Sequence, residues 1–184
     1  GVKAMTIMSM LYIENDMQPP LKDRLQRRAQ ETGMLVCGAN GMGFYNFADR
    51  VTVGGFATRS NHIAGNVTLI SHSGSGMAGI MDCDERINFN LTVSAGQELS
   101  VGMHDYLDFA LEMPTTQVVG LFMETVRKPD LMIQAFAKAA RKHIPIVVIK
   151  TGKTKRSAEL TVSHSGALAG SDDCHQALFR KYGI

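Results

Sequence analysis

The chain has 184 residues, of which 45% are hydrophobic and 20% charged, as in a globular protein of one or two domains. Its formal net charge is +2, and acids and bases are mixed along the chain, so it lacks the basic stripe that binds a nucleic-acid backbone. No apolar run approaches the ~20 residues that span a bilayer, and the first residues lack the layout of a secretory signal. Its 3 cysteines form no C-x-x-C pair, which favours reduced thiols over disulfides or a zinc site. We therefore expect a cytoplasmic protein that binds neither nucleic acid nor membranes.

The first third of the chain predicts two strands with a helix between them and a glycine-rich loop after them. In chain order these are a strand (Ala4–Tyr12), a helix opened by Pro19-Pro20 and ended by Gly33, a strand (Leu35–Cys37) and the loop Gly38–Gly43. Residues 50–66 are rich in Gly, Thr and Asn, so we expect them to be an irregular linker.

The rest of the chain alternates strands and helices. The expected strands are Val67–Ser71, Phe89–Ser94, Val118–Met123 and Ile146–Lys150, and the expected helices are Ser75–Arg86, Met103–Met113, Pro129–His143 and Gly166–Lys181. This alternation predicts a parallel sheet with helices on both faces. Ligands of such sheets bind at the carboxyl ends of the strands, where the glycine-rich turns of this chain lie.

One motif occurs twice. Ser71–Gly74 and Ser163–Gly166 both read Ser-His-Ser-Gly, and each precedes a helix start made of small residues. A helix start exposes unpaired N–H groups that hold an anion, and small residues let a phosphate approach the backbone. The residues that we expect to bind phosphate are Ser73, Gly74, Ser75, Ser165, Gly166 and Ala167. The alternative is that the serines only cap their helices. These arguments do not distinguish His72 from His164.

The segment Ser163–Asp172 resembles the phosphohistidine segment of the ADP-forming acyl-CoA synthetases, which are relatives of the succinyl-CoA synthetase alpha subunit. Three further segments resemble parts of the same family in the same order: Gly38–Gly43 the end of the CoA-binding domain, Ile70–Gly76 the other phosphate-binding turn, and Leu121–Glu124 the strand with a buried glutamate. The resemblance implies a flavodoxin-like domain over residues 63–184, incomplete at its end. The back part of a Rossmann-like CoA-binding domain and a linker would precede it, over residues 1–62.

The resemblance also implies a phosphoryl relay. An acyl-CoA reacts with phosphate to give an acyl phosphate, His164 takes the phosphoryl group, and the phosphohistidine then phosphorylates ADP; the reverse direction makes acyl-CoA from an acid, CoA and ATP. Glu124 would orient the imidazole of His164, as a carboxylate does in other nucleophilic sets. The alternative for Glu124 is a surface acid at a strand end. ATP or ADP and Mg²⁺ would bind to an ATP-grasp domain or subunit that these residues do not contain.

The resemblance assigns Asn40, Gly41 and Gly96 to the binding of CoA or the acid substrate. His72 stands where the family usually has another polar residue, and we expect it to lie beside the phosphate or the substrate. For His72 a solvent-exposed turn histidine is an equal alternative. Two departures bear on the substrate: Gln97 stands where the family usually has Asn, and Ser100 stands where an acidic residue usually follows. The loop from Lys150 to Lys155 is expected to be a solvated basic loop, with assistance to phosphate or CoA as the alternative.

Two other functions compete with the ligase. One is a CoA- or acyl-CoA-sensing module of a fused protein acyltransferase, and the other is a structural subunit that has lost activity. His164 and Glu124 together favour catalysis, because sensing modules often lack the reactive histidine. We expect the chain to be a piece of a longer polypeptide, in a protein compatible with a homo-oligomer.

Overall fold

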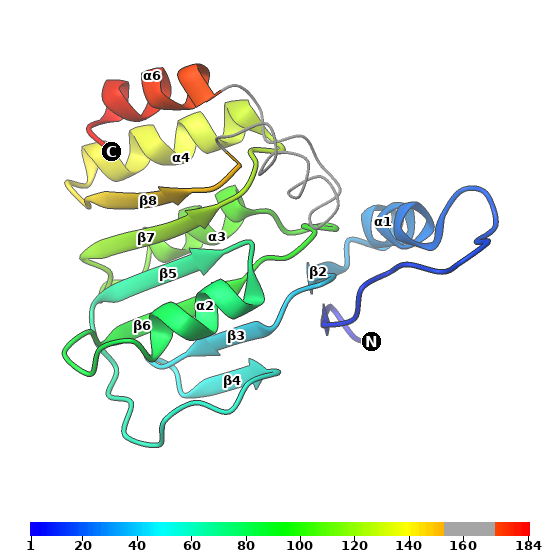
Figure 1. Ribbon diagram of the computed structural model, residues 1–184, viewed down its shortest axis with the longest axis horizontal. Coiled ribbons are helices and arrows are strands. Elements are labelled where there is room, and N and C mark those ends of the chain that lie inside the picture. Colours follow the sequence, from blue (N-terminus) through cyan, green and yellow to red (C-terminus); the bar gives the residue numbers. More distant parts are fainter. Residues whose placement is uncertain (153–171) are drawn as a thin grey trace.

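The computed structural model describes residues 1–152 and 172–184, which form an α/β fold (Figure 1). Its main sheet has six strands in the order β4-β3-β6-β5-β7-β8. These strands are β3 (Gly43–Asn46), β4 (Val51–Gly54), β5 (Val67–Ser71), β6 (Phe89–Ser94), β7 (Val118–Met123) and β8 (Ile146–Lys150). Strands β6, β5, β7 and β8 are parallel, and all four have the predicted bounds. The predicted flavodoxin-like arrangement is confirmed.

The expected linker over residues 50–66 is wrong in its first part. Val51 and Val53 belong to β4, which pairs antiparallel with β3, and β3 in turn pairs antiparallel with β6. Three consecutive β-branched residues, Val51-Thr52-Val53, favour a strand in spite of the two glycines that follow them. Strands from both sides of residue 62 share one sheet. The domain boundary expected at residue 62 stays a prediction.

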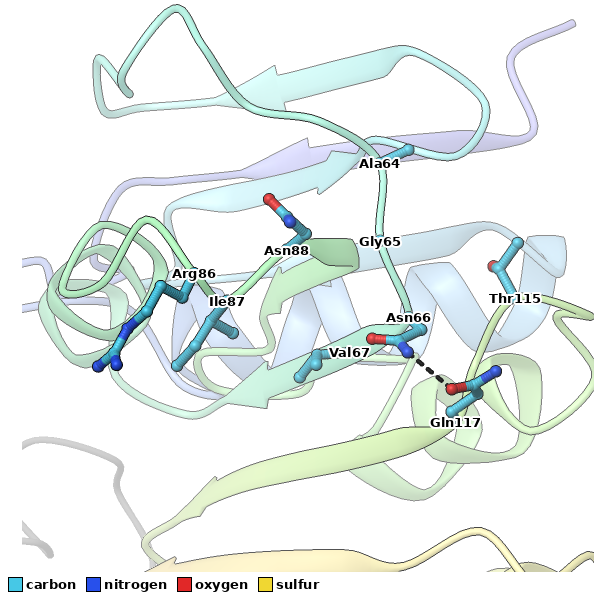
Figure 2. Close-up of a pocket in the computed structure, with 9 residues that line it drawn as sticks. All are labelled: Ala64, Gly65, Asn66, Val67, Arg86, Ile87, Asn88, Thr115 and Gln117. Carbon is cyan, nitrogen blue, oxygen red and sulfur yellow. Dashed lines mark hydrogen bonds between the residues drawn. The ribbon is translucent and has the colours of Figure 1, made fainter.

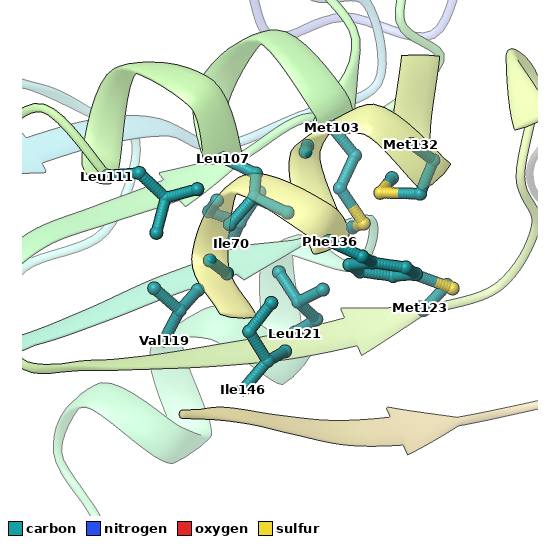
Figure 3. Close-up of a cluster of buried hydrophobic side chains, with 12 residues drawn as sticks. Ile70, Met103, Leu107, Leu111, Val119, Leu121, Met123, Met132, Phe136 and Ile146 are labelled. Atoms are coloured by element: carbon teal, nitrogen blue, oxygen red, sulfur yellow. The ribbon is translucent and has the colours of Figure 1, made fainter. Parts of the chain in front are cut away.

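Helices cover both faces of the sheet (Figure 1). They are α2 (Gly74–Met81), α3 (Met103–Ala110), α4 (Pro129–Arg141) and α6 (Asp172–Tyr182), and α2, α3 and α4 end two or more residues before their predicted ends. Helix α2 packs Met77 and Met81 against Leu69 of β5. The larger cluster lies on the opposite face, where α3, α4 and α6 meet β5, β7 and β8 around Phe136 (Figure 3). Burial of these side chains stabilises the sheet by roughly 1.5–3 kcal/mol each.

The beginning of the chain forms a smaller unit beside the sheet. Strands β1 (Ala4–Ile7) and β2 (Leu35–Gly38) pair in parallel, and helix α1 (Leu21–Thr32) connects them. Gly33 ends α1 in the left-handed conformation, with φ of 66°, as predicted. This unit lies beside the carboxyl end of β6, since the N–H of Leu99 donates to the carbonyl oxygen of Gly38 at 2.9 Å (Figure 1). Within the described residues, no helix is long and apolar enough to cross a membrane.

Candidate active site

Four parallel strands bring their carboxyl ends to one edge of the sheet, and the residues after them form the candidate site. Strand β5 is followed by His72, β6 by the loop that contains Glu98, and β7 by Glu124, while β8 ends at Lys150. Because parallel strands end at the same edge, residues far apart in the sequence become neighbours there. We call this edge the carboxyl edge.

His72 is buried among charged and polar groups of the neighbouring loops. Its side chain is 1% exposed, so the exposed turn histidine considered as an alternative is wrong. The Nδ1 atom accepts the backbone N–H of Glu124 at 2.9 Å. The Nε2 atom lies 3.1 Å from Oε1 of Glu98. The ring of His72 therefore links the end of β5 to the ends of β6 and β7.

Glu98 is the acidic residue of this edge that sequence reasoning missed. Its Oε1 atom also accepts the backbone N–H of Met103 at 2.6 Å, and Oε2 lies 3.2 Å from Nε of Arg127. Burial alone would raise the pKa of Glu98, but the hydrogen bond and electrostatic interaction with His72, the hydrogen bond from Met103 and the charge of Arg127 outweigh burial and lower it. Glu98 is thus held as a carboxylate. The sequence signal that could have identified it is an acid directly after Gly96-Gln97, shortly after the end of a predicted strand.

Glu124 follows β7 and is 7% exposed, which excludes the surface acid considered as an alternative. Its backbone is held on both sides: the N–H by His72, and the carbonyl oxygen by Nζ of Lys150 at 2.9 Å. Lys150 is half-buried, so the first residue of the expected basic loop is a structural contact rather than a solvated charge. Two strand ends therefore fix the peptide groups from which the Glu124 side chain projects.

The start of α2 lies at the same edge. Ser73 caps this helix, because its Oγ atom accepts the N–H of Gly76 at 3.1 Å. A side chain at Gly74 would collide with Met42, since an added Cβ would lie 2.2 Å from its Cγ. The predicted helix start therefore exists, and its lack of a side chain at Gly74 is needed for packing against the glycine-rich loop. Binding of phosphate by Ser73, Gly74 and Ser75 stays a prediction.

The predicted CoA-site residues lie on two loops that are in close backbone contact. The N–H of Gln97 donates to the carbonyl oxygen of Ala39 at 2.7 Å. Gly96 has φ of 57°, and a Cβ there would lie 2.8 Å from the carbonyl oxygen of Asn40. A Cβ at Gly41 would lie 2.7 Å from the carbonyl oxygen of Ser94. The structure thus brings Asn40, Gly41 and Gly96 to the carboxyl edge, although the sequence places them in separate segments.

The predicted phosphorylated residue His164 and its neighbours Ser165, Gly166 and Ala167 lie outside the described residues. The chain is described up to Gly152, directly after the site: the N–H of Thr151 donates to the carbonyl oxygen of Met123 at 3.0 Å. The chain therefore leaves the described sheet at the carboxyl edge, next to Glu124.

A pocket lies at the opposite end of the sheet, where β5 and β7 begin (Figure 2). Its rim includes Asn66 and Gln117, whose side chains share a hydrogen bond of 2.7 Å. Arg86 is the one charged residue that lines it. The predicted site residues that the structure describes do not line this pocket, so it is separate from the carboxyl edge.

The family "Succinyl-CoA ligase like flavodoxin domain" matches residues 64–184. The chain belongs to this family. The alpha subunit of acetate–CoA ligase (ADP-forming) I from Pyrococcus furiosus is 29% identical over the whole chain, which covers 40% of that subunit. Acetate–CoA ligase (ADP-forming) I from Archaeoglobus fulgidus is 27% identical over 89% of the chain and 24% of that protein. The resemblance read from the histidine and glutamate segments is thereby confirmed.

A solved structure has the same fold. The acetyl-coenzyme A synthetase 1 of Candidatus Korarchaeum cryptofilum, in complex with phosphate and ADP, matches all of the chain with a TM-score of 0.85 and 29% identity. The chain covers 39% of that protein. It therefore spans less than half the length of the relatives that it matches, and their remaining parts have no counterpart in these residues.

Proposed function

We propose that this chain is the phosphoryl-carrying part of an ADP-forming acyl-CoA synthetase, an acid–thiol ligase of the cytoplasm. Phosphate attacks the thioester carbon of an acyl-CoA, so that CoA leaves and an acyl phosphate forms. A ring nitrogen of His164 then attacks the phosphorus, the bond to the acyl oxygen breaks, and the carboxylic acid leaves. ADP takes the phosphoryl group in the last step and becomes ATP.

The position of Glu124 supports this proposal most directly. It is a carboxylate buried at the carboxyl edge, in a family whose members include ADP-forming ligases, and its backbone is held on both sides. A carboxylate on one imidazole nitrogen fixes the tautomer and stabilises the positive charge that develops when the other nitrogen attacks. Ser73, Gly74 and Ser75 at the start of α2, with Ser165, Gly166 and Ala167, supply the amides that would hold the phosphoryl group.

The other components follow from the same proposal. CoA and the acid substrate would approach along the loops of Asn40, Gly41 and Gly96, which lie at the carboxyl edge. Residues 1–62 would complete a CoA-binding domain. An ATP-grasp domain or subunit would bind ADP or ATP with Mg²⁺, because the nucleotide-binding part of such ligases is a separate domain.

Phosphorylation of the histidine tests the proposal. The complete enzyme, meaning this chain with its ATP-grasp partner, is incubated with γ-³²P-ATP, and acid-labile, base-stable phosphate on this chain is measured. We expect labelling that His164→Ala abolishes. Labelling that survives His164→Ala would overturn the proposal, and so would a chain that binds CoA but takes no label, as a sensing module would.

The role of Glu124 has a separate test. Glu124→Gln removes the charge but keeps the size of the side chain, so we expect single-turnover formation of phosphohistidine to slow by about 100-fold or more. The matched control is Glu112→Gln, since Glu112 is an exposed carboxylate that pairs with Lys138 and Lys142 at the end of α3. This control should label like the unaltered chain. Equal rates for Glu124→Gln and Glu112→Gln would show that the charge of Glu124 takes no part in phosphorylation.

A further inference from the structure

We propose that His72 is a positioning residue: it holds the backbone of Glu124 in place, is itself held in one tautomer by Glu98, and is not a second phosphoryl acceptor. This inference rests on the proposed function, because it concerns the glutamate that would orient His164. It gives a physical reason why the two identical Ser-His-Ser-Gly motifs would have different functions.

The hydrogen bonds determine which nitrogen of His72 carries the proton. Nδ1 accepts the N–H of Glu124 at 2.9 Å, so it must present a lone pair and be unprotonated. The ring proton is therefore on Nε2, which lies 3.1 Å from Oε1 of Glu98 and donates to it. A neutral ring in the Nε2–H tautomer satisfies both contacts, whereas the other tautomer and the imidazolium would place an N–H against the Glu124 amide.

Glu98 is anchored independently of His72. Its Oε1 atom accepts the Met103 amide at 2.6 Å, and its Oε2 atom pairs with Arg127 at 3.2 Å. Its side chain is only 5% exposed. Because these contacts fix the carboxylate, Glu98 is a rigid acceptor that selects the tautomer of His72.

The same contacts prevent His72 from acting as a nucleophile. Attack on phosphorus needs an unprotonated ring nitrogen with an available lone pair. The lone pair of Nδ1 is engaged by Glu124, Nε2 carries the proton, and the side chain is 1% exposed. His72 therefore acts on the site through its hydrogen bond to the Glu124 amide and not by contact with the substrate.

The tautomer can be measured on the unaltered chain. Long-range ¹H–¹⁵N correlation spectra at pH 7 distinguish an unprotonated nitrogen from a protonated one, and His72→Gln identifies the signals by their loss. We expect His72 as the Nε2–H tautomer. The Nδ1–H tautomer or an imidazolium would overturn the proposal, and this measurement needs no variant that is active.

Two matched substitutions then separate the contacts of His72. The oxygen of His72→Asn lies near the former Nδ1 position and can still accept the Glu124 amide, whereas His72→Gln extends toward Glu98 and loses that acceptor. Single-turnover phosphorylation at saturating ATP should be on the order of 10–100-fold slower in His72→Gln than in His72→Asn, with KM for ATP the same in both. Equal rates, or a difference confined to KM, would contradict the proposal.

Combining His72→Gln with Glu124→Gln tests whether His72 acts through Glu124. If it does, His72→Gln alone slows phosphorylation, but the double variant is less than about 2-fold slower than Glu124→Gln alone, since the carboxylate that His72 positions is already absent. Effects that multiply would mean that His72 acts on its own and would overturn the proposal. Should the His72 variants not fold, Glu98→Gln and its combination with Glu124→Gln replace them. An unaltered enzyme that takes no label at His164 would instead overturn the proposed function, while the tautomer measurement would still decide the role of His72.

Discussion

The sheet holds a buried polar cluster at each end, and the two clusters differ in chemistry. At the carboxyl edge, the ionisable cluster consists of His72, Glu98 and Arg127. Toward the amino ends of the same strands, the neutral cluster consists of Thr68, Asn90 and Thr116. The hydroxyl of Thr68 donates to Oδ1 of Asn90 at 2.7 Å, and Nδ2 of Asn90 donates to the hydroxyl of Thr116 at 2.7 Å.

We infer from this difference that the neutral cluster serves stability, whereas the ionisable cluster serves the proposed chemistry. Neutral amides and hydroxyls cost little to bury when they satisfy one another, and they do not titrate near neutral pH. Buried charges cost more, and a hydrophobic replacement is often as stable. Thr115 lines the pocket of Figure 2 and accepts a hydrogen bond from Nδ2 of Asn90 at 3.0 Å, so the neutral cluster lies close to that pocket. The hydrogen bonds of the cluster join β5, β6 and the turn before β7. The ionisable cluster lies against the backbone of Glu124, where it can position a reacting group.

The largest expected effect is on stability and comes from the neutral cluster. Asn90→Ala deletes the group that both threonine hydroxyls contact and leaves a cavity at a fully buried position. We expect the free energy of unfolding to fall by about 2–4 kcal/mol, measured by urea denaturation. Phosphorylation of His164 in the folded fraction should stay within about 3-fold of the unaltered chain.

Asn66→Ala is the matched control for this substitution. Asn66 is exposed at the same end of the sheet, and its hydrogen bond to Gln117 is open to solvent (Figure 2). Its loss should cost less than about 0.5 kcal/mol. If Asn90→Ala slowed phosphorylation as strongly as Glu124→Gln, the division between a structural end and a chemical end of the sheet would be wrong.

The second effect is smaller and depends on pH. Glu98→Gln keeps the shape of the side chain but removes the charge beside Arg127, and we expect a loss of about 1–2 kcal/mol at pH 7. The folded chain holds the pKa of Glu98 below its ordinary value of 4.5, so the carboxylate contributes stability at every pH above that value. This contribution is lost as the pH falls through the lowered pKa.

The measurement is the difference in unfolding free energy between Glu98→Gln and the unaltered chain. It should be constant from pH 8 to about pH 5 and shrink below about pH 4.5. Glu112, whose pKa its lysine partners lower to about 2, adds an acid-side slope of the same sign, but this slope is common to both chains and cancels. A difference that does not change with pH would show that the cost of Glu98→Gln comes from hydrogen bonds that the amide makes poorly and not from the lost charge.

The sequence was sufficient to predict the four parallel strands of the main sheet, but it did not predict the antiparallel strands β3 and β4 or the contacts at the strand ends. Val67–Ser71 is buried on both faces of the sheet, whereas Ile146–Lys150 is a β-branched run in which Val147 and Ile149 are exposed. Both runs are short and rich in apolar residues, which is the pattern that predicts a strand. The pairing of His72 with Glu98 depends instead on how two loops meet. The loop of Glu98 is placed by contacts with the glycine-rich loop, such as Leu99 N–H to Gly38 O at 2.9 Å, and no local pattern encodes contacts between segments so far apart.

The smallest expected effect concerns Ser73, which lies at the carboxyl edge but makes a neutral contact. Its hydroxyl caps α2, so Ser73→Ala should cost about 1 kcal/mol of unfolding free energy. Ser73→Asp keeps a capping oxygen and adds a negative charge that favours the helix start, so it should be about as stable as the unaltered chain. The same charge would repel a phosphoryl group held there.

Together, the two Ser73 variants separate capping from anion binding. If the start of α2 holds the phosphoryl group, Ser73→Asp slows phosphorylation more than Ser73→Ala does, although it is the more stable of the two. If the serine only caps the helix, stability follows the same order but Ser73→Asp phosphorylates at least as fast as Ser73→Ala. The order of the two phosphorylation rates, compared with the order of the two unfolding free energies, therefore decides the role of the Ser73 hydroxyl. It either serves stability, as we infer for the neutral cluster, or takes part in anion binding at the carboxyl edge.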